Sequence, residues 1–274
     1  MTALGYAEGR DYVIELRSPQ GDMARIPELA AELVALKVDA IVSSGTPTVV
    51  ALSKATREIP ILLTTAGDPV GNGLVASLRR PGGNITGVTS MTTELFTKRL
   101  DLLRQILPKV QRVGILYDAS DPNDMLGLAR FEADCGKLKI QPIRAPVSKA
   151  AEFAAAFNSL ATRKAQALLV TNTGVISVST ASIIELAAKH RLPATYGSSN
   201  WPDVGGLFSY AADFQDLYRR VAAYLNKIFK GAKPGDIPVE QPTLFEFVLN
   251  MKTAKALGLK IPGSILVQVT KVIE

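Results

Sequence analysis

Short apolar runs alternate with helix-like segments along most of this chain, and that alternation limits the fold more than any other feature. The runs DAIV (39–42), PILLT (60–64), RVGILYD (112–118) and QALLVT (166–171) are almost continuously apolar. By contrast, residues 25–36 carry apolar side chains at helical spacing. Parallel strands are covered by helices on both faces and read as continuous apolar runs, so the sequence predicts an α/β fold with parallel sheets flanked by helices.

The same pattern predicts individual elements around these runs. Thr46 and Pro47 are typical of a helix start, so a helix is expected over 47–56. Further expected elements are strands at 12–16 and 84–89 and helices at 70–78, 94–107, 123–137, 150–162 and 179–190. Ligands of such sheets bind at the edge where strands end and helices begin.

The composition argues against several classes of function. The net charge of +6 keeps nucleic acid in consideration, but the basic residues are scattered, as on a solvated surface. The single Cys135 excludes an internal disulfide and a cysteine-rich metal site, and the single His190 argues against a zinc enzyme. RRPGGN (79–84) fits neither the dinucleotide-binding nor the P-loop pattern. These residues therefore argue against a metal centre and give little support to a catalytic role.

A weak internal sequence repeat indicates two lobes of similar topology. IPILLTTAGDPVGNGL begins at Ile59 and LPATYGSSNWPDVGGL begins at Leu192, and their prolines, glycines and leucines match at one offset. Chance similarity between two α/β units is the alternative. The strand, long helix and Pro/Gly-rich segment after residue 206 could carry the chain between the lobes, so that several crossings form a hinge.

Four segments resemble one family over nearly the whole chain: LGYAEGRDYVIEL, IPELAAELVALKVDAIVSSGTP, IPILLTTAGDPVGNGLVASLRRPGGNITGV and the long stretch from GGLFSYAADF to ALGLKIP. The sequence is similar to the ABC-transporter substrate-binding proteins related to tryptophan- and phenylalanine-binding lipoproteins. The resemblance implies a type I periplasmic-binding-protein fold with two Rossmann-like lobes. We expect residues 1–109 and 211–243 in the N-terminal lobe, and 110–210 and 244–274 in the C-terminal lobe.

The resemblance also implies a function. Such proteins are extracytoplasmic, periplasmic or lipid-anchored, and they carry a small carboxylate-bearing ligand between their lobes to an ABC permease in the membrane. We expect an amino acid with an aromatic or large apolar side chain, no cofactor, no catalysis and no nucleic acid. The alternative is a ligand-sensing domain of a receptor or of a transcription regulator, although no DNA-binding module precedes Tyr12.

In the first lobe, hydroxyl groups follow the strands. Ser43, Ser44, Gly45 and Thr46 lie at the expected helix N-terminus, where free N–H groups favour a carboxylate; Thr46 could instead only cap its helix. The next loop offers Thr64, Thr65 and Asp68, whose carboxylate could pair with a ligand ammonium or could cap a turn before Pro69. The loop 87–90, with Thr89, is a third candidate wall.

In the second lobe, three loops hold candidates. Tyr117, Asp118 and Asn123 could cover the ligand. Upstream of the two matched prolines, VDAIVSSGT (38–46) resembles AQALLVTNT (165–173), so Asn172 and Thr173 correspond to Gly45 and Thr46. Tyr196 and Trp201 could stack on a flat ligand side chain. For Trp201 the alternative is simple packing.

The beginning of the chain carries one more expectation. Relatives have a further strand and helix before LGYAEGR, preceded by a signal peptide, and that strand would lie centrally between residues 12–16 and 39–42. We therefore expect the first strand of the N-terminal lobe to be missing here, because the natural start lies upstream or because the lobe rearranges. A rearranged lobe could pair its exposed edge with another chain and form a dimer.

Overall fold

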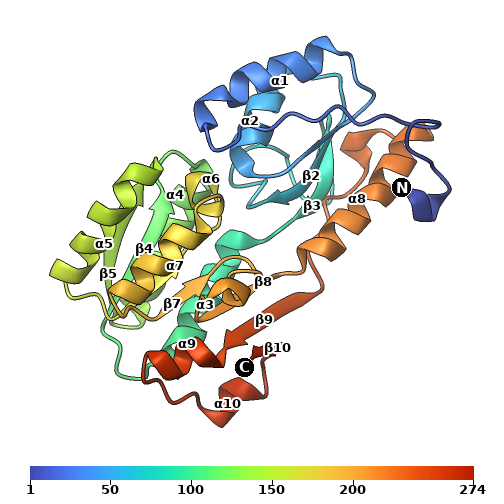
Figure 1. Cartoon of the computed structure of the whole chain (residues 1–274). Helices are drawn as coiled ribbons and strands as arrows, with labels where there is room; N and C mark the ends of the chain where they lie inside the picture. The colour runs from blue at the N-terminus through green and yellow to red at the C-terminus, as the bar shows by residue number, and fades with distance from the viewer. The chain divides into compact units, whose positions relative to one another are not determined.

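The structure is a computed structural model that describes residues 1–274, and the chain divides into two compact units. Unit 1 comprises residues 1–91 and 214–243, and unit 2 comprises residues 92–213 and 244–274. Each unit therefore combines segments that are distant in sequence, and in Figure 1 the orange helix α8 belongs with the blue and cyan elements of unit 1. The helix over 92–106, which the sequence analysis assigns to the first lobe, lies in unit 2.

Unit 1 is built on a three-stranded parallel sheet in the order β1-β2-β3. Its strands and helices are β1 (Ile41–Ser43), β2 (Ile61–Ala66), β3 (Ile85–Thr89), α1 (Ile26–Ala35), α2 (Thr46–Ala55) and α8 (Phe214–Phe229). Helices α1 and α2 pack together, with α2 against β2, while α8 packs against β2 and β3. The sheet is thus covered by helices on both faces, which explains why every residue of β2 except the half-buried Thr65 is buried.

The strand predicted at residues 12–16 is absent. Residues 13–17 form no strand, and Val13, Ile14 and Leu16 are exposed. Strand β1 is consequently the edge of the sheet, because no strand pairs with its outer side. A strand exists only when a neighbour accepts its hydrogen bonds, so the β-rich composition of this segment is insufficient here.

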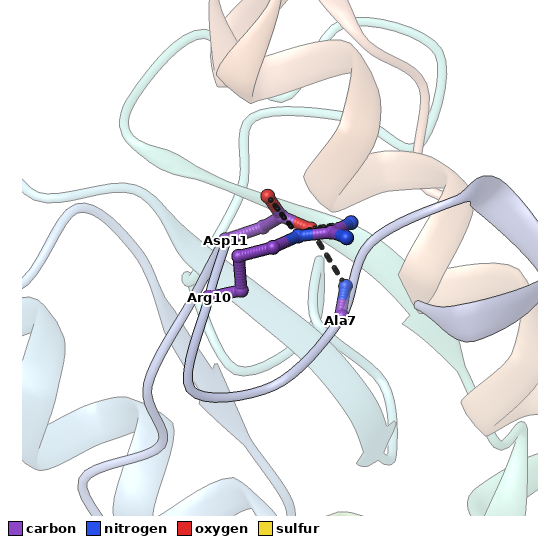
Figure 2. Close-up of polar contacts among 3 residues, drawn as sticks. All are labelled: Ala7, Arg10 and Asp11. Atoms are coloured by element: carbon purple, nitrogen blue, oxygen red, sulfur yellow. Dashed lines mark hydrogen bonds and ion pairs between the residues drawn. The ribbon is translucent and has the colours of Figure 1, made fainter.

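A tight turn precedes that segment. The Asp11 carboxylate accepts a hydrogen bond from the Ala7 amide (2.8 Å) and pairs with Arg10 (2.8 Å). Figure 2 shows both contacts closing the turn. The pairing is fully exposed, so it sets the local course of the chain and adds little stability.

Unit 2 is built on a seven-stranded sheet in the order β10-β9-β8-β7-β6-β4-β5. Every neighbouring pair is parallel except β8 with β9. The strands are β4 (Arg112–Asp118), β5 (Gln141–Val147), β6 (Ala167–Val170), β7 (Ala194–Tyr196), β8 (Phe208–Ala212), β9 (Phe245–Asn250) and β10 (Lys271–Ile273). The helices are α3 (Thr92–Ile106), α4 (Pro122–Lys137), α5 (Phe153–Thr162), α6 (Gly174–Ser177), α7 (Thr180–Lys189), α9 (Met251–Ala256) and α10 (Gly263–Leu266).

Each face of this sheet has its own core. Ile115 and Leu169 point to the core that contains Phe96 and Phe131 from α3 and α4. Their chain neighbours Leu116 and Leu168 point to the core formed with α5 and α7. From β4 the chain runs through α4 to β5 on one side, and from β5 through α5 to β6 on the other side of β4. The carboxyl ends of β4 and β6 therefore form the topological switch point, where open α/β sheets bind ligands.

Elsewhere the expected helices are present within a few residues, with one exception. Residues 70–78 form turns instead of a helix, and Gly73 there has a φ of 67°, a left-handed conformation. No helix is both long and apolar enough to cross a bilayer.

Candidate functional site

Hydrogen bonds join the loops that follow the three strands of unit 1. The Thr64 hydroxyl donates to the Ser43 carbonyl (3.1 Å), and the Gly67 amide donates to the Thr46 hydroxyl (3.3 Å). On the far side, the Thr89 hydroxyl donates to the Gly67 carbonyl (2.5 Å). Four predicted site residues (Ser43, Thr46, Thr64 and Thr89) therefore lie together, all buried, and they fix this edge of the sheet.

The loop between β1 and α2 presents a helix N-terminus to its surroundings. Gly45 has φ 81° and ψ 140°, a conformation that glycine adopts far more readily than other residues. The Ser43 hydroxyl donates to Thr48 Oγ1 (3.0 Å), whose own hydroxyl contacts the Ser44 and Gly45 carbonyls. The Ser44 side chain remains exposed. Ten helical residues follow, so the N–H groups and the helix dipole favour an anion at this loop.

Asp68 closes a turn in the next loop. Its carboxylate accepts from the Gly71 amide (2.7 Å), and its carbonyl accepts from the Asn72 amide and side chain. This geometry fits the capping alternative; the ammonium role stays a prediction. Thr65 is half-buried, and its carbonyl accepts from the Ser90 hydroxyl (2.9 Å).

Asp118 stands at the switch point of unit 2, at the carboxyl end of β4. One carboxylate oxygen accepts from the Ser120 amide (2.9 Å) and hydroxyl (2.6 Å), and the other accepts from the Val175 amide (3.3 Å). The residue is 1% exposed. Its carboxylate therefore ties β4 to the start of α6.

Two further carboxylates lie at the start of α4, Asp121 as its N-cap and Asp124 in its first turn. Asp124 Oδ2 accepts from the Asp118 amide (2.8 Å) and from the hydroxyls of Thr171 (2.7 Å) and Thr173 (2.5 Å). Asp121 caps the helix by accepting from the Asn123 amide (2.8 Å). Burial, with nearby carboxylates, raises the pKa of Asp121 to about 7, and burial raises the pKa of Asp124 to about 6.

A buried cation lies beside this cluster. Arg99 on α3 is 1% exposed and donates to the carbonyls of Leu95, Thr92 and Val170. Its guanidinium also stacks over the Phe96 ring at 4.7 Å. Burial lowers the pKa of Arg99 to about 9, although the negative charge of Asp124 opposes that effect. Arg99 thus supports the end of β6 from the α3 side.

The predicted aromatic residues are buried in the two cores of unit 2. Tyr117 is 5% exposed and packs in the core with Phe96 and Phe131. Tyr196 and Trp201 are each 1% exposed and stack on one another with ring centroids 4.8 Å apart. This arrangement fits the packing alternative for Trp201, and the stacking role of the pair on a ligand stays a prediction.

Of the remaining predicted residues of unit 2, Asn123 and Thr173 belong to the same hydrogen-bond network, and Asn172 pairs with Trp201. Asn123 accepts from Thr93 (3.1 Å) and donates to Thr92 (3.1 Å). Asn172 is half-buried and accepts from the Trp201 indole N–H (3.3 Å), which leaves its amide nitrogen as a donor. The hydroxyl of Thr173 is engaged by Asp124, so this threonine positions its own loop.

Three residues of this network were missed by the sequence analysis. Arg99 did leave a signal, because it interrupts an apolar stripe of α3 that runs through Leu95, Leu102 and Leu103. Asp121 precedes a proline at a helix start, a capping signature. Asp124 left no signal, because its partners lie up to 49 positions away.

Comparisons with known proteins identify the family. The family described as "ABC transporter substrate binding protein" matches residues 1–273. A tyrosine-binding protein of Clostridioides difficile is 28% identical over 93% of this chain and 73% of its own length. A crystal structure of an ABC domain in complex with L-Trp from Streptococcus pneumoniae is 28% identical and superimposes with a TM-score of 0.92, covering 99% of this chain and 91% of that one.

A conserved domain protein from Vibrio cholerae is 27% identical, with a TM-score of 0.94 over 99% of this chain and 90% of its own. A Lac repressor and a ribose operon repressor, at 13% and 14% identity, share the fold alone. The expected two-lobed α/β fold and the absence of catalysis agree with these relationships. The chain belongs to the ABC transporter substrate-binding protein family and is the component that binds the transported substrate.

Proposed function

We propose that this protein binds an L-amino acid with an aromatic side chain and delivers it to a membrane permease from the extracytoplasmic side. The observation that carries the proposal is the 28% identity, over nearly the whole chain, to a structure solved with L-Trp. The similarity to a tyrosine-binding protein points to the same class of ligand.

Within unit 1, we assign the ligand carboxylate to the loop of Ser44, Gly45 and Thr46. Three features support this assignment: an α2 N-terminus with unpaired N–H groups, an exposed serine hydroxyl, and a glycine that leaves the backbone accessible. Hydrogen bonds to a charged group contribute about 1.5–3 kcal/mol each, so two or three approach the roughly 8 kcal/mol of a micromolar complex.

A panel of ligands tests the class. L-tryptophan, L-tyrosine and L-phenylalanine are each added in a thermal-shift assay, with tryptamine (no carboxylate) and indole-3-propionate (no ammonium) as controls. At 100 times the dissociation constant a ligand stabilises the folded protein by about 2.7 kcal/mol. We expect stabilisation by at least one of the three amino acids and none by tryptamine. If none of the three stabilises the protein, the ligand class is wrong.

Two variants test the location. Ser44→Ala removes the exposed hydroxyl, and Ser53→Ala on α2 is a matched control whose hydroxyl donates to the Val50 carbonyl of its own helix. We expect Ser44→Ala to weaken binding of the amino acid about tenfold and Ser53→Ala to leave it unchanged.

Unit 1 also contains a rival basic hollow of about 750 Å³, lined by Arg79, Arg80, Asp236 and Pro238. It lies at the amino end of β3, away from the loop of Ser44. Loss of affinity in Arg80→Ala, with normal affinity in Ser44→Ala, would move the carboxylate site to this hollow.

A further inference from the structure

The loop that follows β6 has an unusual anchor. Backbone pairing between β4 and β6 ends at Leu116 and Val170, and the Thr171 amide makes the last strand-like bond, to the Leu116 carbonyl (3.1 Å). Beyond this point the two chains separate at the switch point. Asp124 connects the two chains there, because one oxygen of its carboxylate accepts hydrogen bonds from the Asp118 amide and from the hydroxyls of Thr171 and Thr173.

The same loop is held from two other directions. The Val175 amide donates to Asp118 (3.3 Å), and Gly174 passes so close that a Cβ there would lie 1.9 Å from the Asp118 carboxylate. Arg99 donates to the Val170 carbonyl (3.3 Å). The carboxylate of Asp124 is the only one of these anchors that binds two side chains of the loop itself.

The strength of this anchor depends on whether the Asp124 carboxyl is ionised or protonated. The ionisable groups around Asp124 are Asp118 on β4, Asp121 on its own helix, Arg99 on α3 and Tyr117 on β4. Asp124 Oδ1 and Asp121 Oδ2 are buried without a hydrogen-bond donor. A buried oxygen that accepts no hydrogen bond leaves the ionised carboxylate poorly stabilised, and burial raises the pKa of Asp124.

We propose that Asp124 is a positioning residue, which fixes the loop 171–175 in the conformation that presents Asn172 to the ligand. The contribution of that loop to binding rests on the proposed function, whereas the anchoring by Asp124 does not. When Asp124 is ionised it accepts three hydrogen bonds. When it is protonated it accepts them less strongly, and the loop loosens.

The anchoring is tested on ligand-free protein by NMR of a sample labelled with 15N at threonine. Between pH 8 and pH 5, the amides of Thr171 and Thr173 are expected to shift with one common midpoint. Thr162 at the end of α5 serves as an internal control. In Asp124→Asn this step should be absent. In Asp121→Asn it should persist, because Asp124 still titrates, and Asp121, which has the higher pKa of the two, is already largely protonated when it does.

The consequence for binding is tested by calorimetry with L-tryptophan at pH 7. Asp124→Ala is expected to lose at least tenfold in affinity. The matched control is Asp134→Ala on the same helix, whose carboxylate also accepts from a threonine hydroxyl, that of Thr97 (2.5 Å). The affinity of Asp134→Ala for L-tryptophan should stay within twofold of that of the wild type. If Asp124→Ala does not fold, Asp124→Asn takes its place, with the affinity measured at pH 8 and pH 5.

The two arms separate the possible failures. A wild-type protein that binds none of the three aromatic amino acids but shows the shared titration refutes the proposed ligand class and supports the anchor. Threonine amides that do not titrate, or that titrate unchanged in Asp124→Asn, overturn the anchor. A loop that changes in Asp124→Ala without any loss of affinity for L-tryptophan overturns its role in binding.

Discussion

Replacing Asp121 by asparagine should stabilise unit 2 at alkaline pH and have little effect at acidic pH. Asp121 is 1% exposed and one of its oxygens has no donor. Its pKa rises from 3.8 to about 7, first because of burial and then because of the charge of Asp124. The folded protein therefore holds the proton more tightly than the unfolded chain. The stability gained from this proton is fully present below pH 4 and is lost as the pH rises through 7.

The magnitude follows from that shift. A pKa raised from 3.8 to about 7 corresponds to about 4 kcal/mol of destabilisation of the ionised form at pH 8. Asparagine keeps the cap on the Asn123 amide, since Asn and Asp cap helices equally well. Its new N–H₂ group replaces an oxygen that has no donor, and an unmet donor costs about 1–3 kcal/mol. We therefore expect a net gain of about 1–3 kcal/mol at pH 8.

The assay is urea unfolding at pH 8 and pH 5, followed by fluorescence of Trp201. This is the only tryptophan of the chain, and it is buried in a core of unit 2, so the signal reports that unit. Asp134→Asn is the control of opposite sign. Burial raises the pKa of Asp134, but hydrogen bonds from Thr97 and Lys137 outweigh this effect and lower the pKa, so this variant should be less stable than the wild type at pH 8. Equal effects of Asp121→Asn at both pH values would refute the reasoning.

Two further predictions concern one substitution, Gly174→Ala, and the reactivity of Cys135. Gly174→Ala should destabilise unit 2 by about 2 kcal/mol or more in the same unfolding assay, because φ is 46° and the new Cβ would lie 1.9 Å from the Asp118 carboxylate; a variant as stable as the wild type would mean that the loop moves away at no cost. Cys135 is fully buried and its pKa is raised to about 12, mainly by burial, so it should resist iodoacetamide at pH 8 until urea unfolds the protein; mass spectrometry showing rapid alkylation of the folded protein would contradict the packing around α4.

The sequence predicts the parallel sheets well because their signal is local. Strands such as β6 are buried from end to end, and a continuous apolar run follows directly from that burial. The expectations that fail depend on distant or special geometry. Residues 12–16 lack a neighbouring strand, and residues 70–78 turn at Gly73 with a left-handed φ, which apolar spacing does not reveal.

In the candidate site, too, some features were predictable from the sequence and others were not. The loops were predictable, since the ends of parallel strands share one edge of a sheet. Side-chain directions were not, because they depend on the pleat: Leu116 and Tyr117 are adjacent but belong to different cores. The partners of Asp124 were not predictable either, because Thr171 lies 47 positions further along the chain.

The interleaving of the two units has a consequence for biosynthesis. During translation the strands of unit 1 leave the ribosome early, but α8, which packs against β2 and β3, is made only after residue 213. Leu217, Val221 and Tyr224 of that helix are buried, so one face of the nascent sheet stays uncovered while more than a hundred later residues are synthesised. Unit 2 must in turn wait for β9, beyond residue 243. Unit 1 is complete only at residue 243 and unit 2 only at residue 274, so nascent chains of this protein should depend on chaperones until these late segments emerge.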